Sequence, residues 1–310
     1  MNQSVSQDSE DNARISPTHS SSGNAERNNN AADGSAAPLS TSGNINSGAA
    51  VPLNGADTNR RGTGKEPVNG HHDPCKRRLY VSILMFSIGN ALVGLVLILV
   101  WMLNYRPTTG FGLSSAGQMA NLHPLMMYTF MVSVNMYTVL IYRTHYCMAK
   151  SKLKWAHAIL SGTNILMSLL GVAAMFKAHL MAGQANFYSL HSWIGAMTNA
   201  FYFVQFLSGC FAFLKPGWTT QAQRARLMPW HRLAGAAILV LAAAAAVTGI
   251  AELVIFQDSK TAVYAKFAPI TFIANVAGVC VILMTASSVY LLTERAWLRP
   301  ALPEEAPLKR

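Results

Sequence analysis

Residues 190–214 read LHSWIGAMTNAFYFVQFLSGCFAFL, a continuous run without any Asp, Glu, Lys or Arg. A helix needs about 20 mostly apolar residues to cross the hydrocarbon core of a bilayer. Backbone groups in lipid must satisfy their hydrogen bonds within the segment, so this run predicts a transmembrane helix. It contains one histidine, His191, and a histidine in a span is costly and usually functional.

Five further stretches have a similar length and apolar content. They lie at roughly 79–103, 122–142, 155–176, 230–256 and 268–292. We therefore expect an all-α, multi-pass integral membrane protein with six transmembrane helices. The membrane domain should occupy residues 76–300, between a tail of residues 1–75 and a short C-terminal tail of residues 301–310.

The N-terminal tail differs in composition from the rest of the chain. Residues 1–73 are rich in Ser, Asn, Gly and Ala, and they hold eight acidic and five basic residues. A segment of this kind buries too little apolar surface to offset its chain entropy, so we expect it to be disordered. The chain's net charge is +11, so the residues after this tail, with 19 basic and five acidic residues, carry a net charge of +14. Their Lys and Arg cluster between spans, which indicates membrane topology and no nucleic-acid partner.

The basic residues predict the orientation of the spans. One set of loops and flanks is rich in cations: Lys76, Arg77, Arg78, Arg143, Lys150, Lys152, Lys154, Lys215, Arg224, Arg226, Arg295 and Arg299. The opposite face carries only Arg106, Lys177, Lys260 and Lys266. By the positive-inside rule, both termini are cytosolic. No sorting motif selects among a vesicle, an endolysosomal and a plasma membrane.

This topology arranges four histidines as two facing pairs. His123 and His191 begin inward-running spans near the outer face, whereas His157 and His231 begin outward-running spans near the inner face. Neutral imidazole is a standard axial ligand of haem iron, and helix bundles build such sites from facing side chains. Two imidazoles leave no open coordination position, which favours electron transfer over oxygen chemistry. We expect a central four-helix bundle that holds two b haems.

Two other function classes stay open at this point. A transporter or channel could use core histidines for protons or metal without haem, and the purified protein would then be colourless. Glu252, near the end of a span, is almost the only acidic residue in the spans, which disfavours a transporter. A haem-containing electron hub would be coloured but would pass its electrons to a partner protein.

Charged residues near the span ends have both a simple and a functional interpretation. Arg143 ends the second span, and Lys150 and Lys154 follow it. They could serve topology alone, or they could dock an anionic electron donor beside the inner histidines. His179 is predicted to lie in a short loop just past the outer end of the third span, near Lys177. It is either a surface residue or part of a site for an anionic or metal-chelate substrate.

A series of short motifs adds a further signal. In order along the chain, these are NLHPLM at 121–126, VLIYR at 139–143, KWAH at 154–157, FYSLHSW at 187–193, YFVQ at 202–205, PWH at 229–231 and TERAWLRP at 293–300. Together they resemble the cytochrome b561 family of six-span, two-haem transmembrane oxidoreductases that use ascorbate. The resemblance covers about residues 80–300 and aligns all four histidines.

The resemblance implies a role for each group of residues. The ligands of the non-cytosolic b haem would be His123 and His191, and those of the cytosolic b haem would be His157 and His231. Cytosolic ascorbate would bind near Arg143, Lys150 and Lys154. The outer acceptor, monodehydroascorbate or a ferric chelate, would bind near Phe176, His179, Asn186 and Tyr188. The family is typically homodimeric, and its activity is that of a ferric or monodehydroascorbate reductase.

Overall fold

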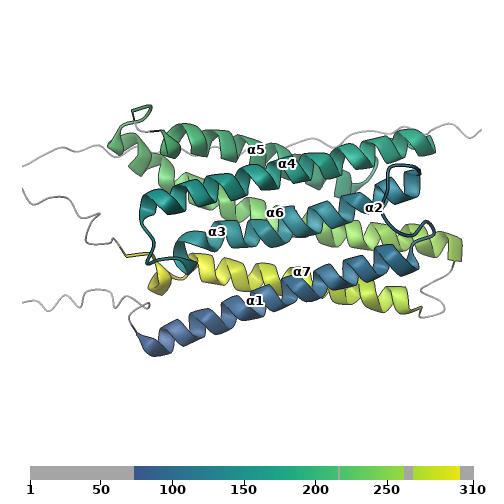
Figure 1. The fold of residues 1–310 in the computed structure, drawn as a ribbon, viewed down its shortest axis with the longest axis horizontal. Helices are drawn as coiled ribbons and strands as arrows, with labels where there is room; N and C mark the ends of the chain where they lie inside the picture. The colour runs from purple at the N-terminus through teal and green to yellow at the C-terminus, as the bar shows by residue number, and fades with distance from the viewer. Residues whose placement is uncertain (1–72, 216, 262–267, 301–310) are drawn as a thin grey trace, which may run out of the picture. The chain divides into compact units, whose positions relative to one another are not determined.

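The computed structural model describes residues 73–215, 217–261 and 268–300. The N-terminal tail, which was predicted to be disordered, lies almost entirely outside the described residues. The short C-terminal tail, residues 301–310, also lies outside them. Within the described residues, six helical spans are long and apolar enough to cross a membrane. Figure 1 shows these helices with their axes roughly aligned. These spans confirm the prediction of an all-α protein with six transmembrane helices.

Several spans combine α-helix with a wider π-helical segment. The first span consists of α1 (Pro74–Val100) and η1 (Trp101–Tyr105). The second consists of α2 (Ala116–Met126), η2 (Met127–Val134) and α3 (Asn135–Thr144). The third is α4 (Lys150–Ala182), and the fourth is α5 (Leu190–Gly209) with η3 (Cys210–Leu214). The fifth and sixth are α6 (Gln221–Thr261) and α7 (Pro269–Thr293), and a 3-10 turn, η4 (Arg295–Trp297), follows.

Local capping signals explain where α4 and α5 end and begin. Ser189 and Ser192 form a reciprocal capping box at the start of α5, which places His191 in its first turn. Gly183, with a φ of 64°, ends α4 in the left-handed conformation that glycine tolerates. The third span therefore continues beyond residue 176, and His179 lies in its last turn. The prediction that His179 lies in a loop past the span is wrong for this reason.

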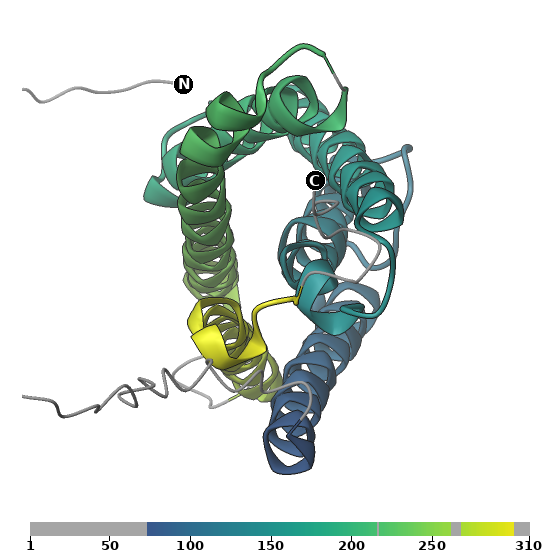
Figure 2. The same cartoon turned by 90° about the vertical axis from the view of Figure 1, so that its left-hand side faces the viewer.

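The second to fifth spans form the expected four-helix bundle. The second span packs on α4, α4 on α5, α5 on α6, and α6 returns to η2 and α3. Figure 2 shows the helices nearly end-on. The first and sixth spans pack on each other, and α7 also contacts α3 and α6. Large buried side chains from these elements form the main apolar core, among them Trp101, Met102, Leu239 and Met284.

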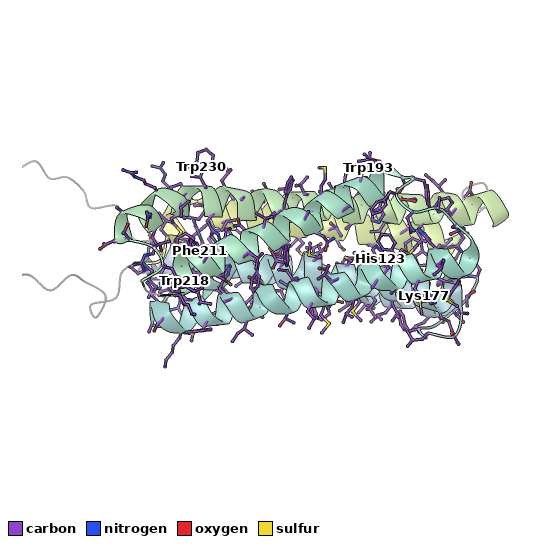
Figure 3. All side chains as sticks on the ribbon, turned by 90° about the horizontal axis from the view of Figure 1, so that it is seen from above. His123, Lys177, Trp193, Phe211, Trp218 and Trp230 are labelled. Atoms are coloured by element: carbon purple, nitrogen blue, oxygen red, sulfur yellow. The ribbon has the colours of Figure 1, made fainter. Side chains whose placement is uncertain are left out.

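The surface of the bundle suits a lipid environment. Large apolar side chains are exposed along α4 and α5, including Leu166, Leu170 and Phe201. An apolar surface of this extent is expected to contact lipid or another protein. Trp193 and Trp230 are exposed toward opposite ends of the bundle, as Figure 3 shows. Tryptophans near both ends are typical of the two membrane–water interfaces.

Candidate functional site

The two histidines predicted near the outer face, His123 and His191 (the outer pair), lie on α2 and α5. The rings of His123 and His191 have centroids 5.9 Å apart and planes at 87° to each other. Nδ1 of His123 lies 3.1 Å from the carbonyl oxygen of Gly171, and Nδ1 of His191 lies 2.8 Å from that of Ala245. Because a carbonyl oxygen only accepts, each Nδ1 donates and each Nε2 keeps its lone pair. Metal-ligating histidines commonly have this arrangement.

The two histidines predicted near the inner face, His157 and His231 (the inner pair), lie on α4 and α6. The rings of His157 and His231 have centroids 6.3 Å apart. Nδ1 of His157 donates to the carbonyl oxygen of Thr138 at 2.9 Å, which again leaves Nε2 as the free acceptor. The backbone carbonyl of His231 accepts a hydrogen bond of 2.6 Å from Nε2 of Gln205. The structure thus brings together the two pairs that were predicted from the topology.

Two glycines let the backbone approach these rings closely. A Cβ atom added at Gly249 would lie 2.6 Å from Cε1 of His191, and one added at Gly209 would lie 3.0 Å from Cε1 of His231. Glycine has no Cβ and so permits such an approach. Neither glycine was predicted from the sequence to be part of a site. A glycine inside an apolar helix can indicate a close contact with a neighbouring group. The sequence alone, however, does not say which ring lies opposite each glycine.

Both pairs fit a b-type haem. An iron–imidazole bond is about 2 Å long, so two rings on one iron should have centroids about 6 Å apart. Each pair lines its own cavity, of ≈ 400 Å³ for the outer pair and ≈ 340 Å³ for the inner pair. Among the described residues, no group of three or more His, Cys, Asp or Glu could hold a bare metal ion. Paired imidazoles suit an iron whose other four ligands come from a macrocycle.

Comparison with known proteins agrees with this geometry. A family model for eukaryotic cytochrome b561 matches residues 122–257, which include all four histidines. The transmembrane ascorbate-dependent reductase of Bos taurus is 35% identical over 220 residues, covering 70% of this chain and 85% of that protein. The chain belongs to the cytochrome b561 family. Membership of this family implies a b-type haem cofactor.

Two further relatives widen the comparison within the cytochrome b561 family. The human transmembrane ascorbate-dependent reductase is 35% identical over 188 residues, which cover 61% of this chain and 74% of that protein. The plasma membrane ascorbate-dependent reductase of Mus musculus is 28% identical over 234 residues, covering 75% of this chain and 79% of that protein. The similarity therefore includes most of the membrane domain.

The inner cavity of this cytochrome b561 is strongly basic. Among the described residues, its lining includes five cations and no Asp or Glu; the cations are Arg143, Lys150, Lys154, Arg232 and Arg299. The first three are the residues predicted for the donor site. Arg143 is buried and donates from Nη1 to the carbonyl of Glu294, and Nζ of Lys154 donates to that of Phe213 at 3.2 Å. A cavity lined by charges of one sign concentrates anions.

The segment after α7 supplies one of these cations. Trp297 is buried, and its ring centroid lies 5.6 Å from that of Tyr80 and 5.5 Å from that of Tyr290. Nη2 of Arg299 donates to the carbonyl of Met148 at 2.9 Å, so the segment crosses toward the loop between α3 and α4 (Figure 2). The sequence predicts only a topological role for Arg299, because the route of this residue back to the cavity depends on the burial of Trp297.

The outer cavity gathers all four residues predicted for the acceptor site. Phe176, His179, Asn186 and Tyr188 line it together with His123 and His191. Nδ1 of His179 lies 2.8 Å from Oδ1 of Asn186 and donates to it. Partial burial and the neighbouring Glu252 carboxylate raise the pKa of Tyr188 to about 12. The Tyr188 hydroxyl is therefore protonated at physiological pH.

A strained backbone presents two of these residues. Phe187, between Asn186 and Tyr188, has a φ of 58°, in the left-handed region. Such a conformation in a residue other than glycine costs on the order of 1 kcal/mol and is concentrated at functional sites. Its carbonyl accepts a hydrogen bond of 3.0 Å from Nε1 of Trp193. This hydrogen bond ties the strained turn to the start of α5.

Proposed function

We propose that this chain is an ascorbate-dependent transmembrane oxidoreductase. It takes one electron from cytosolic ascorbate and delivers it to a non-cytosolic acceptor, monodehydroascorbate or ferric ion. The main support is the presence of two histidine pairs in separate cavities toward opposite ends of one four-helix bundle. The relatives described above are ascorbate-dependent reductases, which supports the same donor.

The four histidines would hold two b haems. His123 and His191 would be the axial ligands near the outer end, and His157 and His231 those near the inner end. Bound haem supplies reversible one-electron chemistry at its iron. The backbone carbonyls that accept from His123, His157 and His191 fix the orientation of these rings. With two histidines held toward each haem, the protein would keep water and oxygen away from the iron.

The basic residues of the inner cavity would bind the donor. Ascorbate is an anion near neutral pH, and Arg143, Lys150 and Lys154 would attract and orient it. Ascorbate loses one electron and one proton to become monodehydroascorbate, and the proton passes to water at the inner face. At the outer face, the acceptor gains that electron. Phe176, His179, Asn186 and Tyr188 would position it there.

Orientation and assembly complete the proposal. The five cations that the structure describes in the inner cavity support a cytosolic position for that end of the bundle, and we therefore infer that both termini are cytosolic. The family resemblance further suggests a homodimer. Vesicle, endolysosomal and plasma membranes are all compatible with this arrangement.

Reconstituted vesicles test the proposal directly. Purified protein is incorporated into vesicles loaded with ascorbate, and ferricyanide, which does not cross the bilayer, is added outside. We expect ferricyanide to be reduced only in vesicles that contain the protein, and we expect two haems per chain. A colourless protein would favour the haem-free transporter. A protein with both haems that leaves ferricyanide oxidised would favour the electron hub.

A further inference from the structure

Within the part of the chain that the structure describes, the outer cavity has a single strong cation. Arg106 is the one Lys or Arg among the described residues that line it, and Glu252 is the one acidic residue. Arg106 directly follows η1, at the start of the connection to α2. By contrast, the inner cavity has five cations. Among the described residues, recognition of an anion in the outer cavity therefore depends mainly on Arg106, whereas in the inner cavity several cations share this role.

A buried amide holds this guanidinium in place. Nε of Arg106 donates to Oδ1 of Asn121 at 3.0 Å. Asn121 is fully buried, and its Nδ2 donates to the carbonyls of Thr108 and Gly110, each at 2.8 Å. Asn121 lies two residues before His123 on α2. The Asn121 side chain thus holds the segment between η1 and α2 against α2, and it fixes Arg106 near the outer histidine pair.

The contacts of Arg106 leave most of its donors available. Among the described residues, its hydrogen bond uses only Nε, and the partner is a neutral amide. Burial lowers the pKa of Arg106, which shows that the charged form is held at a desolvation cost. A guanidinium has five N–H donors in a planar fork that matches a carboxylate. No described residue occupies either Nη group, so both can bind a ligand that carries such a group.

We propose that Arg106 is the anion-binding residue of the outer cavity and that its Nη groups take a carboxylate or a similar anionic oxygen. This inference rests on the proposed function. The anionic oxygen could belong to a haem propionate or to an anionic acceptor, such as a carboxylate chelate of ferric ion. In either case Asn121 is the positioning residue, since it contacts Arg106 and not the ligand.

The test compares Arg106→Gln with Lys177→Gln in the purified full-length protein. Both changes remove one positive charge near the outer end, but Lys177 is exposed and does not line the cavity (Figure 3). Three properties are measured in each: haem content, the midpoint potentials of both haems, and the KM for two acceptors in the vesicle assay. The acceptors are ferric citrate, which is anionic, and hexaammineruthenium(III), which is cationic.

The two sources of the anion predict different results. If the acceptor is the ligand, Arg106→Gln raises the KM for ferric citrate roughly tenfold or more, since hydrogen bonds to charged groups are strong. The KM for hexaammineruthenium(III) and both midpoint potentials stay unchanged. If a haem propionate is the ligand, the outer haem is partly lost or its midpoint potential falls, while the inner haem is unaffected.

Other outcomes separate failure of this inference from failure of the proposed function. If Arg106→Gln matches Lys177→Gln in every measurement, the inference is overturned. If the wild-type protein lacks haem or does not reduce either acceptor, the proposed function fails instead. Full occupancy of the inner haem reports a folded variant. If Arg106→Gln does not fold, Arg106→Lys is measured in its place. If the KM for ferric citrate and the midpoint potential of the outer haem in Arg106→Lys then equal those of the wild type, the planar guanidinium fork has no role in binding the anion.

Discussion

His123 and His191 lie on different helices, yet their ring centroids are 5.9 Å apart, and each donates to the backbone of a further helix. The carbonyl of Gly171 in α4 accepts from His123, and that of Ala245 in α6 accepts from His191. All four spans of the bundle therefore contribute to one pair of rings. Correct placement of the outer site requires the whole bundle and not two helices alone.

Removal of one histidine should empty one site selectively. In His157→Ala or His231→Ala we expect haem content to fall by about half with the outer haem retained, because each bis-histidine site needs both axial ligands. His123→Ala or His191→Ala should have the reverse effect. Haem-to-protein ratio and the reduced-minus-oxidised spectrum measure this. His145→Ala is the control, since His145 contacts Tyr137 and lines neither cavity. Two full haems in any ligand variant would contradict the assignment.

Gly249→Ala should disturb the outer site without removing any ligand. The added Cβ would lie 2.6 Å from Cε1 of His191, so the ring or the helix must shift, and overpacking of this kind costs roughly 1–3 kcal/mol. We expect reduced outer-haem occupancy or a shifted outer midpoint potential. Gly278→Ala is the matched control, because a Cβ there meets nothing within 4 Å. Equal behaviour of the two variants would rule out this role for Gly249.

Arg299→Gln should weaken the response to ascorbate at the inner face while haem content is retained. Arg299 is one of five cations lining the inner cavity, so its loss should raise the KM for ascorbate only about two- to fivefold. Salt screens such charges, so the difference should shrink at high ionic strength. Arg295→Gln removes an exposed charge from the same segment that does not line the cavity, and it should leave the KM unchanged. A similar KM for both variants would show that Arg299 serves topology alone.

Tyr188 should affect stability at alkaline pH. Its pKa is raised from 10.0 to about 12, so above pH 10 the unfolded chain loses this proton while the folded protein keeps it. Its contribution to stability is therefore complete below pH 10 and is lost as the pH rises through 12. Thermal unfolding at pH 9 and pH 11 should show a smaller alkaline loss in Tyr188→Phe than in the wild type. The difference should be modest, since the side chain is 53% exposed.

The number and approximate limits of the spans were predictable because each is a local property of the chain. A long apolar run must form a helix in lipid whatever its neighbours are. The end of α4 was predicted less well. Residues 177–182 include Lys177 and His179, and their polarity suggested a loop, whereas the helix continues to the left-handed Gly183. Hydropathy marks where a helix enters water and not where its hydrogen bonds end.

By itself, the sequence determined the six spans, the four histidines at the span ends and the motifs of the cytochrome b561 family, since each depends on adjacent residues or on spacing along one helix. The tertiary structure alone decided which groups share a cavity. Arg299 lies far along the chain from His157 and His231, whose cavity it lines. The hydrogen bond from Arg106 to Asn121 likewise joins the end of the first span to the second. Gly209 and Gly249 matter only because a particular ring faces each of them. Such proximity comes from packing between helices, because the lateral arrangement of spans is not encoded in the periodicity of any one of them.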